Sequence, residues 1–160
     1  GVAVIRVGGL TESEMKERKF RVEDAFNATK AAYSDGIVPG GGTTYLRMAQ
    51  ALESVKARGD EKLGVAILAK ALEAPAAQIA TNAGFNGDVV VANLKEKAGA
   101  IGFNAIDGSY VDMFKAEVID PTKVARCALS NAASVASTVL TTNVMVTDLK
   151  DEEAITGALT

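Results

Sequence analysis

The chain of 160 residues has no histidine, no tryptophan, three prolines and a single cysteine. The lone Cys127 excludes an intrachain disulfide, and the lack of histidine leaves no zinc site of the usual Cys/His type. A reducing, cytosol-like compartment is the natural interpretation. The sequence also shows no signal-peptide pattern and no apolar run near the ~20 residues that cross a bilayer. It therefore predicts a soluble protein without a membrane partner.

Neither positive nor negative charge dominates the chain, which has 17 Lys and Arg and 20 Asp and Glu residues. The net charge of -3 comes from interspersed acids and bases, which argues against a nucleic-acid surface or a polybasic membrane patch. Apolar residues make up 48% of the chain, so a disordered protein is excluded. The chain begins with "GVAVIRVGG" and without methionine, so we expect it to be part of a longer protein.

Most of the chain has a helical pattern. Thr11 and Glu14 form a capping-box motif, and the helix that follows should end at Gly36. A second helix should follow residue 43 and stop near residue 59, with Asp60 capping a third. Pro75 should kink or divide that third helix before residue 84. Residues 88–97 predict a shorter helix, and residues 122–140 an alanine-rich helix that is buried on several sides.

Strand-like segments are few and short. Residues 1–7 and 143–149 predict a strand at each end of the chain, and aromatic and β-branched residues around Asp107 and Gly108 predict a hairpin. The fold class is therefore mainly α: a helical bundle with short β-strands at both ends and a β-hairpin. Asp120, followed by Pro121, has the pattern of a helix N-cap.

A glycine-rich loop stands out in "IVPGGGTTYLRMAQALE", residues 37–53. It lacks the Gly-Lys-Ser/Thr ending of a phosphate-binding P-loop, and its contiguous glycines do not match the dinucleotide-binding spacing. From the motif alone, a tight turn between helices is favoured. Three glycines are nevertheless more than a turn needs, and they would let another molecule approach the backbone closely. A ligand contact therefore stays open.

Several long segments resemble one family, in the same order and at similar intervals. They are "RVEDAFNATKAAYSDGIVPGGG", "FNAIDGSYVDM", "IDPTKVARCALSNAASVAS" and "MVTDL". These segments are similar to the C-terminal part of group I chaperonins, the GroEL family, and the resemblance covers essentially the whole chain.

The resemblance implies a domain organisation. Residues 1–38 would be the returning intermediate-domain segment, and residues 39–160 the C-terminal half of the equatorial, nucleotide-binding domain. The apical domain would be missing, as would the N-terminal equatorial half, which carries the phosphate-binding loop and the magnesium-binding aspartate in the family. The cofactor implied is ATP or ADP with Mg²⁺, with no metal ligand in this chain. The implied partners are identical subunits in stacked rings, a co-chaperonin and non-native polypeptide.

The resemblance also assigns a catalytic role to Asp24, which matches the family's catalytic aspartate. The residues alone predict a solvated surface acid, because Asp24 lies about 200° around the helix from Val22. The implied mechanism brings Asp24 down to orient or deprotonate the water that attacks the γ-phosphate.

The other implied residues would contact the nucleotide. Gly41 and its neighbours Gly40 and Gly42 would line the sugar and base side of the pocket, and Asp120 would bind the ribose hydroxyls. Asn104 and Ala105 would meet the adenine, with Val118 packing near the base. The plainer interpretations are that Asp120 only caps a helix, that Asn104 shapes the hairpin and that Val118 is ordinary core.

Two residues depart from the family pattern. Ile106 and Asp107 stand where the family commonly has a small residue and a threonine, which changes the adenine side of the site.

The segment "NVMVTDL" matches a strand that, in the family, pairs with the neighbouring subunit in the ring. The resemblance therefore implies an assembly contact at this segment.

The sequence thus predicts a fragment of an ATP-dependent chaperonin that assists protein folding. We expect the isolated chain to be inactive towards ATP and client proteins, and to self-associate or to be partly disordered, because uncovered core faces would leave an apolar patch in water. The alternative is a helical assembly module derived from a chaperonin, without a nucleotide function. Bacterial cytoplasm is the first expectation for its location, with plastid or mitochondrial matrix behind it.

Overall fold

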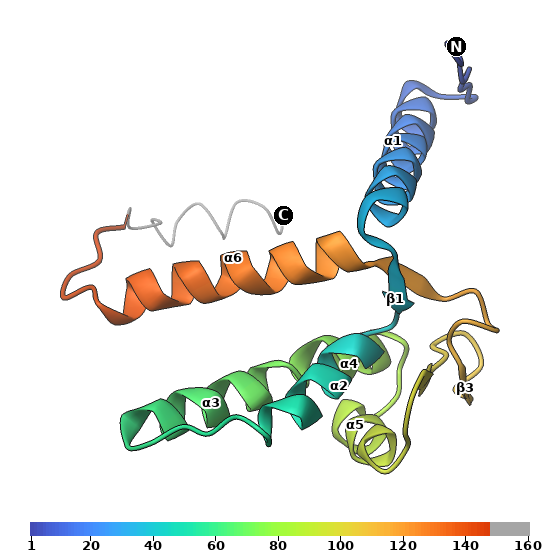
Figure 1. Ribbon diagram of the computed structural model, residues 1–160. Helices are drawn as coiled ribbons and strands as arrows, with labels where there is room; N and C mark the ends of the chain where they lie inside the picture. Colours follow the sequence, from blue (N-terminus) through green and yellow to red (C-terminus); the bar gives the residue numbers. More distant parts are fainter. Residues whose placement is uncertain (148–160) are drawn as a thin grey trace, which may run out of the picture. The chain divides into compact units, whose positions relative to one another are not determined.

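A computed structural model of the chain describes residues 1–147, and these form six helices and four short strands (Figure 1). The contacts divide the described residues into two units, Gly1–Arg126 and a second one that begins at Cys127. The domain boundary predicted between residues 38 and 39 stays a prediction. The elements are α1 (Glu12–Asp35), β1 (Ile37–Pro39), α2 (Thr43–Leu52), α3 (Asp60–Ala71), α4 (Ala74–Asn82), α5 (Gly87–Lys95), β2 (Ile101–Phe103), β3 (Tyr110–Asp112), β4 (Ile119–Pro121) and α6 (Thr122–Leu140).

The caps predicted for α1 are confirmed, with one change of partner. The Thr11 hydroxyl accepts a hydrogen bond from the Glu14 amide at 3.2 Å. The Glu14 carboxylate accepts a hydrogen bond from the Leu10 amide at 2.8 Å, where a capping box would use the Thr11 amide. Gly36 ends the helix with φ of 81°, in the left-handed region that favours glycine. Large apolar side chains of α1 are not covered in the described structure, since Phe26 is 61% exposed and Tyr33 95% exposed.

The strands predicted at the two ends of the chain are wrong. Residues 1–7 have no strand structure, and Val2 is 95% exposed. Residues 143–147 likewise have no strand structure, while positions 148 and 149 lie outside the described residues. A strand is stable only when a second strand pairs with it. In residues 1–147 neither segment has such a partner.

The strands that do form lie elsewhere. The predicted hairpin is confirmed: β2 pairs with β3, with Gly102 opposite Val111. A second antiparallel pair joins β1 to β4, with Val38 opposite Asp120. The β1/β4 pair was not predicted, because each strand has three residues and about 80 residues of sequence separate them.

The main core lies where α2, α4 and α5 meet the hairpin (Figure 1). Phe103 of β2 stacks edge-on against Phe85, with ring centroids 5.1 Å apart, and lies 5.7 Å from the ring of Tyr110. The core cluster consists of Leu46, Ala76, Ala80, Val90, Val91, Leu94 and Phe103.

The third predicted helix is divided, as the proline predicted. α3 ends at Ala71, and Pro75 lies in the first turn of α4, where its missing N–H costs no hydrogen bond. Gly59, not Asp60, is the residue before α3.

By length and composition, residues 60–82 could cross a membrane, so the expectation that no apolar stretch is long enough is wrong. Glu73 at the break binds Lys70 and Lys95, and Ala76 and Ala80 pack in the core.

Two further helices differ from the prediction in detail. α5 begins at Gly87, where the Asn86 side chain accepts hydrogen bonds from the amides of Asp88 and Val89. α6 was expected to be buried on several sides, but only Ala125 is buried among its residues in the described structure. A helix is buried only by elements that pack against it, and within residues 1–147 most of α6 has no such cover.

Arg47 on α2 ties the helices to the hairpin. Its guanidinium donates to three backbone carbonyls: Leu94 at 3.1 Å, Gly99 at 2.9 Å and Ile101 at 3.0 Å. Burial lowers the pKa of Arg47. The Leu94 carbonyl lies near the C-terminus of α5, where a cation also interacts favourably with the helix dipole.

We expect the substitution Arg47→Met to lower the free energy of unfolding by about 2–3 kcal/mol, because it removes charged donors from three carbonyls while keeping the aliphatic stem. Urea unfolding measures this. The control is Arg21→Met, whose exposed pair with Glu17 on α1 should matter by only a few tenths of a kcal/mol. Equal effects of the two substitutions would contradict the role of Arg47.

Substitutions of the two threonines after the glycine loop should change the stability of the chain in opposite directions. The Thr43 hydroxyl is fully buried and has no hydrogen-bond partner within the described residues, whereas the Thr44 hydroxyl donates to the Pro39 carbonyl at 2.6 Å. We expect Thr43→Val to stabilise the chain by about 1 kcal/mol and Thr44→Val to destabilise it by a similar amount. Thermal unfolding of both variants tests the pair, and a destabilised Thr43→Val variant would show that the buried hydroxyl is satisfied.

Candidate functional site

The glycine loop connects β1 directly to α2 and has a conformation that glycine favours. Gly41 has φ of 64° and Gly42 has φ of 76°, both in the left-handed region. Gly40 and Gly42 are buried, while Gly41 keeps part of its surface exposed. The loop therefore presents one glycine outwards between two that face the protein.

The chain itself packs closely against each of the three glycines. A Cβ atom on Gly40 would lie 3.0 Å from the Val118 carbonyl oxygen, and one on Gly42 would lie 2.6 Å from the Ala76 amide nitrogen. A Cβ on Gly41 would lie 2.9 Å from the end of the Met113 side chain. A tight turn is thus present, but it joins strand β1 to α2 and not two helices as predicted. The close approach to the loop backbone comes from the protein's own residues.

Hydrogen bonds fix the loop at both ends. The Gly40 amide donates to the Val118 carbonyl at 2.9 Å, and the Thr43 amide donates to the Gly40 carbonyl at 3.1 Å. The Thr44 hydroxyl closes the loop on the Pro39 carbonyl. No side chain caps the first turn of α2, so backbone N–H groups at this helix start are without a side-chain partner in the described structure.

Asp120 lies beside this loop because β4 pairs with β1. The predicted N-cap role of Asp120 is wrong: α6 begins two residues later, at Thr122, and Asp120 belongs to β4. Its carboxyl group is partly buried, and this burial raises its pKa. Among residues 1–147 no hydrogen bond or positive charge offsets this rise. The strand pair therefore holds an unpartnered carboxylate two residues from Val118, which touches the loop.

Tyr45 is a neighbour that the sequence did not single out as a site residue. Burial raises the pKa of the Tyr45 phenol, and the negative charge of Asp120 raises it further. The Tyr45 hydroxyl donates to the Ala125 carbonyl at 3.2 Å. The sequence signal for Tyr45 was its position three residues after Gly42, at the start of the predicted second helix.

The hairpin supplies another side of the site. A Cβ on Gly41 would lie 3.6 Å from the carbonyl oxygen of Phe103, the residue before Asn104. The Asn104 side-chain oxygen accepts from the Ile106 amide at 3.0 Å, so the prediction that Asn104 shapes the hairpin is confirmed. Ala105 packs partly against the core cluster. Ile106, one of the two departures from the family pattern, is 94% exposed.

Asp107, the other departure, is used within the turn. Its carboxylate accepts hydrogen bonds from the hydroxyl of Ser109 at 2.7 Å and from the amide of Ser109 at 3.0 Å. The side-chain bond, followed by the backbone bond, lowers the pKa of Asp107. These contacts stiffen the end of the hairpin that carries Asn104.

Asp24 is not among the residues that these contacts bring together. It lies on α1 with its side chain exposed, as the helical pattern predicted. The loop glycines, Val118 and Asp120 are joined by backbone contacts, and Phe103 adds the hairpin. Within residues 1–147 no group of three or more Cys, Asp or Glu side chains is placed to hold a metal ion.

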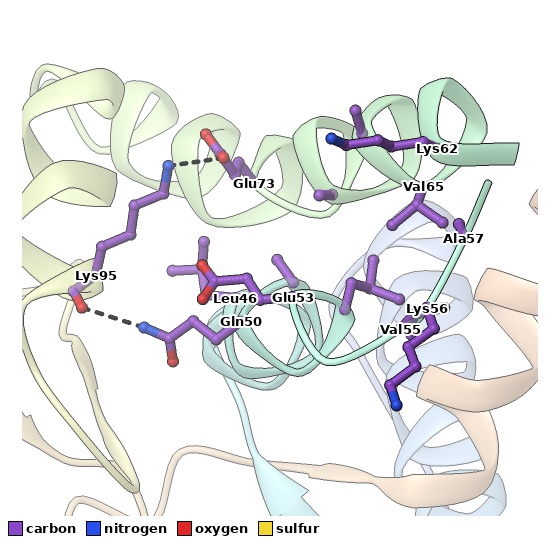
Figure 2. A pocket seen from close by; sticks show the side chains of 14 residues that line it. Leu46, Gln50, Glu53, Val55, Lys56, Ala57, Lys62, Val65, Glu73 and Lys95 are labelled. Atoms are coloured by element: carbon purple, nitrogen blue, oxygen red, sulfur yellow. Dashed lines mark hydrogen bonds and ion pairs between the residues drawn. The ribbon is translucent and has the colours of Figure 1, made fainter. Parts of the chain in front are cut away.

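A groove lies elsewhere, between α2 and α3 (Figure 2). It has a volume of about 580 Å³ and an apolar lining that includes Leu46, Leu52 and Val65. At one end the Lys95 ammonium binds the Glu73 carboxylate at 2.7 Å, and the Gln50 amide donates to the Lys95 carbonyl at 3.1 Å (Figure 2). None of the predicted site residues lines this groove.

Comparison with known proteins identifies the family. The family model of the TCP-1/cpn60 chaperonins matches residues 1–150. A solved structure, described as a crystal structure of a group III chaperonin in the open state, is similar with a TM-score of 0.79 and 33% sequence identity. The match covers 88% of this chain and 30% of that one, so the chain spans less than a third of the chaperonin it resembles. The narrower assignment to group I stays a prediction. On the family match and this structural similarity, the chain belongs to the TCP-1/cpn60 chaperonin family.

Proposed function

We propose that this chain supplies the ribose and base side of an ATP site in a chaperonin subunit. The observation that carries the proposal is the juxtaposition of the glycine loop with Asp120, whose carboxylate is partly buried and unpartnered. Buried carboxylates are normally hydrogen-bonded, so one without a partner is suited to receive donors from a ligand. Membership of the chaperonin family supports ATP as that ligand.

The ribose would bind Asp120. Two vicinal hydroxyl groups can donate to the two oxygens of one carboxylate, and hydrogen bonds to a charged acceptor are among the stronger ones. The partly exposed backbone of Gly41 would lie against the sugar.

The base would meet the hairpin and Val118. Asn104 uses its side-chain oxygen inside the turn, which leaves its NH₂ group to donate to a ring acceptor. Val118 is partly buried beside the loop and offers an apolar contact, with Ala105 on the hairpin side. Gly40 and Gly42 act indirectly, because their close packing fixes the shape of the loop.

Hydrolysis would depend on Asp24. We assign to it the role of orienting or deprotonating the attacking water, a step that a positioned carboxylate can accelerate by about 10²–10⁴-fold. Its exposed position on α1 fits a group that reaches the nucleotide only after α1 moves. The loop has no lysine for the phosphates, so phosphate- and Mg²⁺-binding groups would come from the remainder of the subunit. Mg²⁺ would neutralise the charge that develops on the phosphates.

The whole subunit would then be an ATP-hydrolysing chaperonin. We propose stacked rings of identical subunits that act on non-native polypeptide with a co-chaperonin, in a bacterial cytoplasm. Family membership supports the ring in general terms.

One observation favours a second candidate, a helical assembly module without nucleotide. The space at the three glycines is already occupied by Val118, Met113 and Ala76, so close packing alone would explain the loop. The two candidates differ in whether a subunit that contains these residues binds ATP.

We expect Asp24→Ala to lower the kcat of ATP hydrolysis by about 10²-fold or more in the full-length subunit, with ADP affinity unchanged. Phosphate release and calorimetry measure the two quantities. The control is Glu23→Ala, a neighbouring exposed acid on the same helix.

The 160-residue chain alone should release no phosphate above background and should bind ATP with Mg²⁺ weakly or not at all. Tight binding that Gly41→Trp abolishes would show that the site is complete within this chain.

We expect Asp120→Asn to separate stability from binding. Burial raises the pKa of Asp120 above its ordinary value of 3.8 in the folded chain. Its contribution to stability is therefore present below that value and is lost as the pH rises through the folded pKa. The asparagine variant should therefore melt higher than the parent near pH 7, and the difference should vanish below pH 3.8. In the full-length subunit the same variant should bind ADP more weakly. A lower melting temperature at pH 7 would contradict the buried, unpartnered carboxylate.

A further inference from the structure

Tyr45 connects the glycine loop to the segment that carries Asp120. It lies in the first turn of α2, three residues after Gly42, and is partly buried. Its hydroxyl donates to the carbonyl of Ala125, 80 residues further along the chain. Ala125 is 6% exposed and lies in the first turns of α6, five residues after Asp120. The bond therefore joins the two elements that flank the candidate ribose site.

Asp120 is held from both sides by this arrangement. On one side, β4 pairs with β1 and so with the strand that leads into the loop. On the other side, β4 continues without a break into α6. Two contacts fix the start of α6: the Thr122 amide donates to the Gly36 carbonyl at 3.0 Å, and the Arg126 guanidinium binds the Asp35 carboxylate at 2.8 Å. The Tyr45 hydroxyl adds the contact that fixes this start to α2.

The chemistry of the phenol also keeps Asp120 free. A tyrosine hydroxyl has one proton to donate, and in this structure the proton goes to the Ala125 carbonyl. Asp120 therefore faces Tyr45 as a nearby charge and not as a hydrogen-bond acceptor, which agrees with the way its charge acts on the phenol. Within residues 1–147 both carboxylate oxygens remain open to other donors.

We propose that Tyr45 is a positioning residue for nucleotide recognition: it holds the unpartnered Asp120 carboxylate beside the glycine loop and thereby sets selectivity for a ligand with vicinal ribose hydroxyls. This inference rests on the proposed function of Asp120 and names the residue through which that function is tuned. Tyr45 itself need not touch the nucleotide.

The test compares two ligands on the full-length subunit, ADP and 2′,3′-dideoxy-ADP, by calorimetry with Mg²⁺ present. The parent should bind ADP about ten-fold or more tightly than the dideoxy form, because charge-assisted hydrogen bonds to Asp120 are lost with the hydroxyls. Tyr45→Phe keeps the ring and removes only the hydroxyl. We expect it to reduce this ratio at least about three-fold, mainly by weakening ADP binding.

Two controls separate positioning from general damage. Tyr33→Phe removes a hydroxyl from a tyrosine that is 95% exposed on α1 and should leave the ratio unchanged. Asp120→Asn should bring the ratio close to one. A general loss of structure in Tyr45→Phe would weaken both ligands alike and leave the ratio intact.

The outcomes are distinct. A reduced ratio in Tyr45→Phe and Asp120→Asn, with Tyr33→Phe unchanged, supports the proposal. A ratio that responds to Asp120→Asn but not to Tyr45→Phe overturns the role of Tyr45 and leaves the ribose site in place. A parent without any preference for ADP, or an Asp120→Asn variant that keeps it, overturns the ribose role of Asp120 itself.

Discussion

The arrangement of the candidate site depends on one partly buried cation. Arg47 donates to carbonyls at the end of α5, in the following loop and at the start of β2, so three separate segments share one guanidinium. Taking a guanidinium out of water is costly, and three carbonyl acceptors offset that cost because the planar fork can meet them together. Arg47 lies on α2, the helix that directly follows the glycine loop. By binding the start of β2, it therefore also holds the hairpin, with the Phe103 carbonyl, close to Gly41.

The glycine loop is rigid for reasons internal to the protein. Positive φ angles and close contacts with Val118, Met113 and Ala76 require glycine whether or not a ligand is present. These constraints are compatible with a binding role, because a loop that is already fixed loses little conformational entropy when a ligand binds. What distinguishes a binding site from a plain turn here is the neighbouring Asp120, whose burial without a partner weakens the fold and is explicable if a ligand supplies the donors.

Local signals in the sequence predicted local structure well. The Thr11 cap, the end of α1 at Gly36, the break before Pro75 and the hairpin are each set by a few adjacent residues, and all are confirmed. The terminal strands were wrong because a strand depends on a partner that periodicity does not reveal. The β1/β4 pair, Arg47 and Tyr45 were missed because their contacts join segments about 50 to 80 residues apart. The role of Asp24 came from resemblance alone, since an exposed acid on a helix carries no chemical signal of its own.

The three loop glycines differ in how freely evolution can replace them. At Gly42 an added Cβ would meet the backbone nitrogen and Cα of Ala76, and no change of side chain at position 76 can move those atoms. At Gly41 the obstacle is the flexible end of Met113, which a shorter residue would remove, and asparagine or aspartate tolerates the left-handed backbone. Glycine is therefore required at position 42 as long as this packing is kept. Positions 41 and 113 form a pair that can drift together, so variation in this loop should be concentrated at its exposed centre.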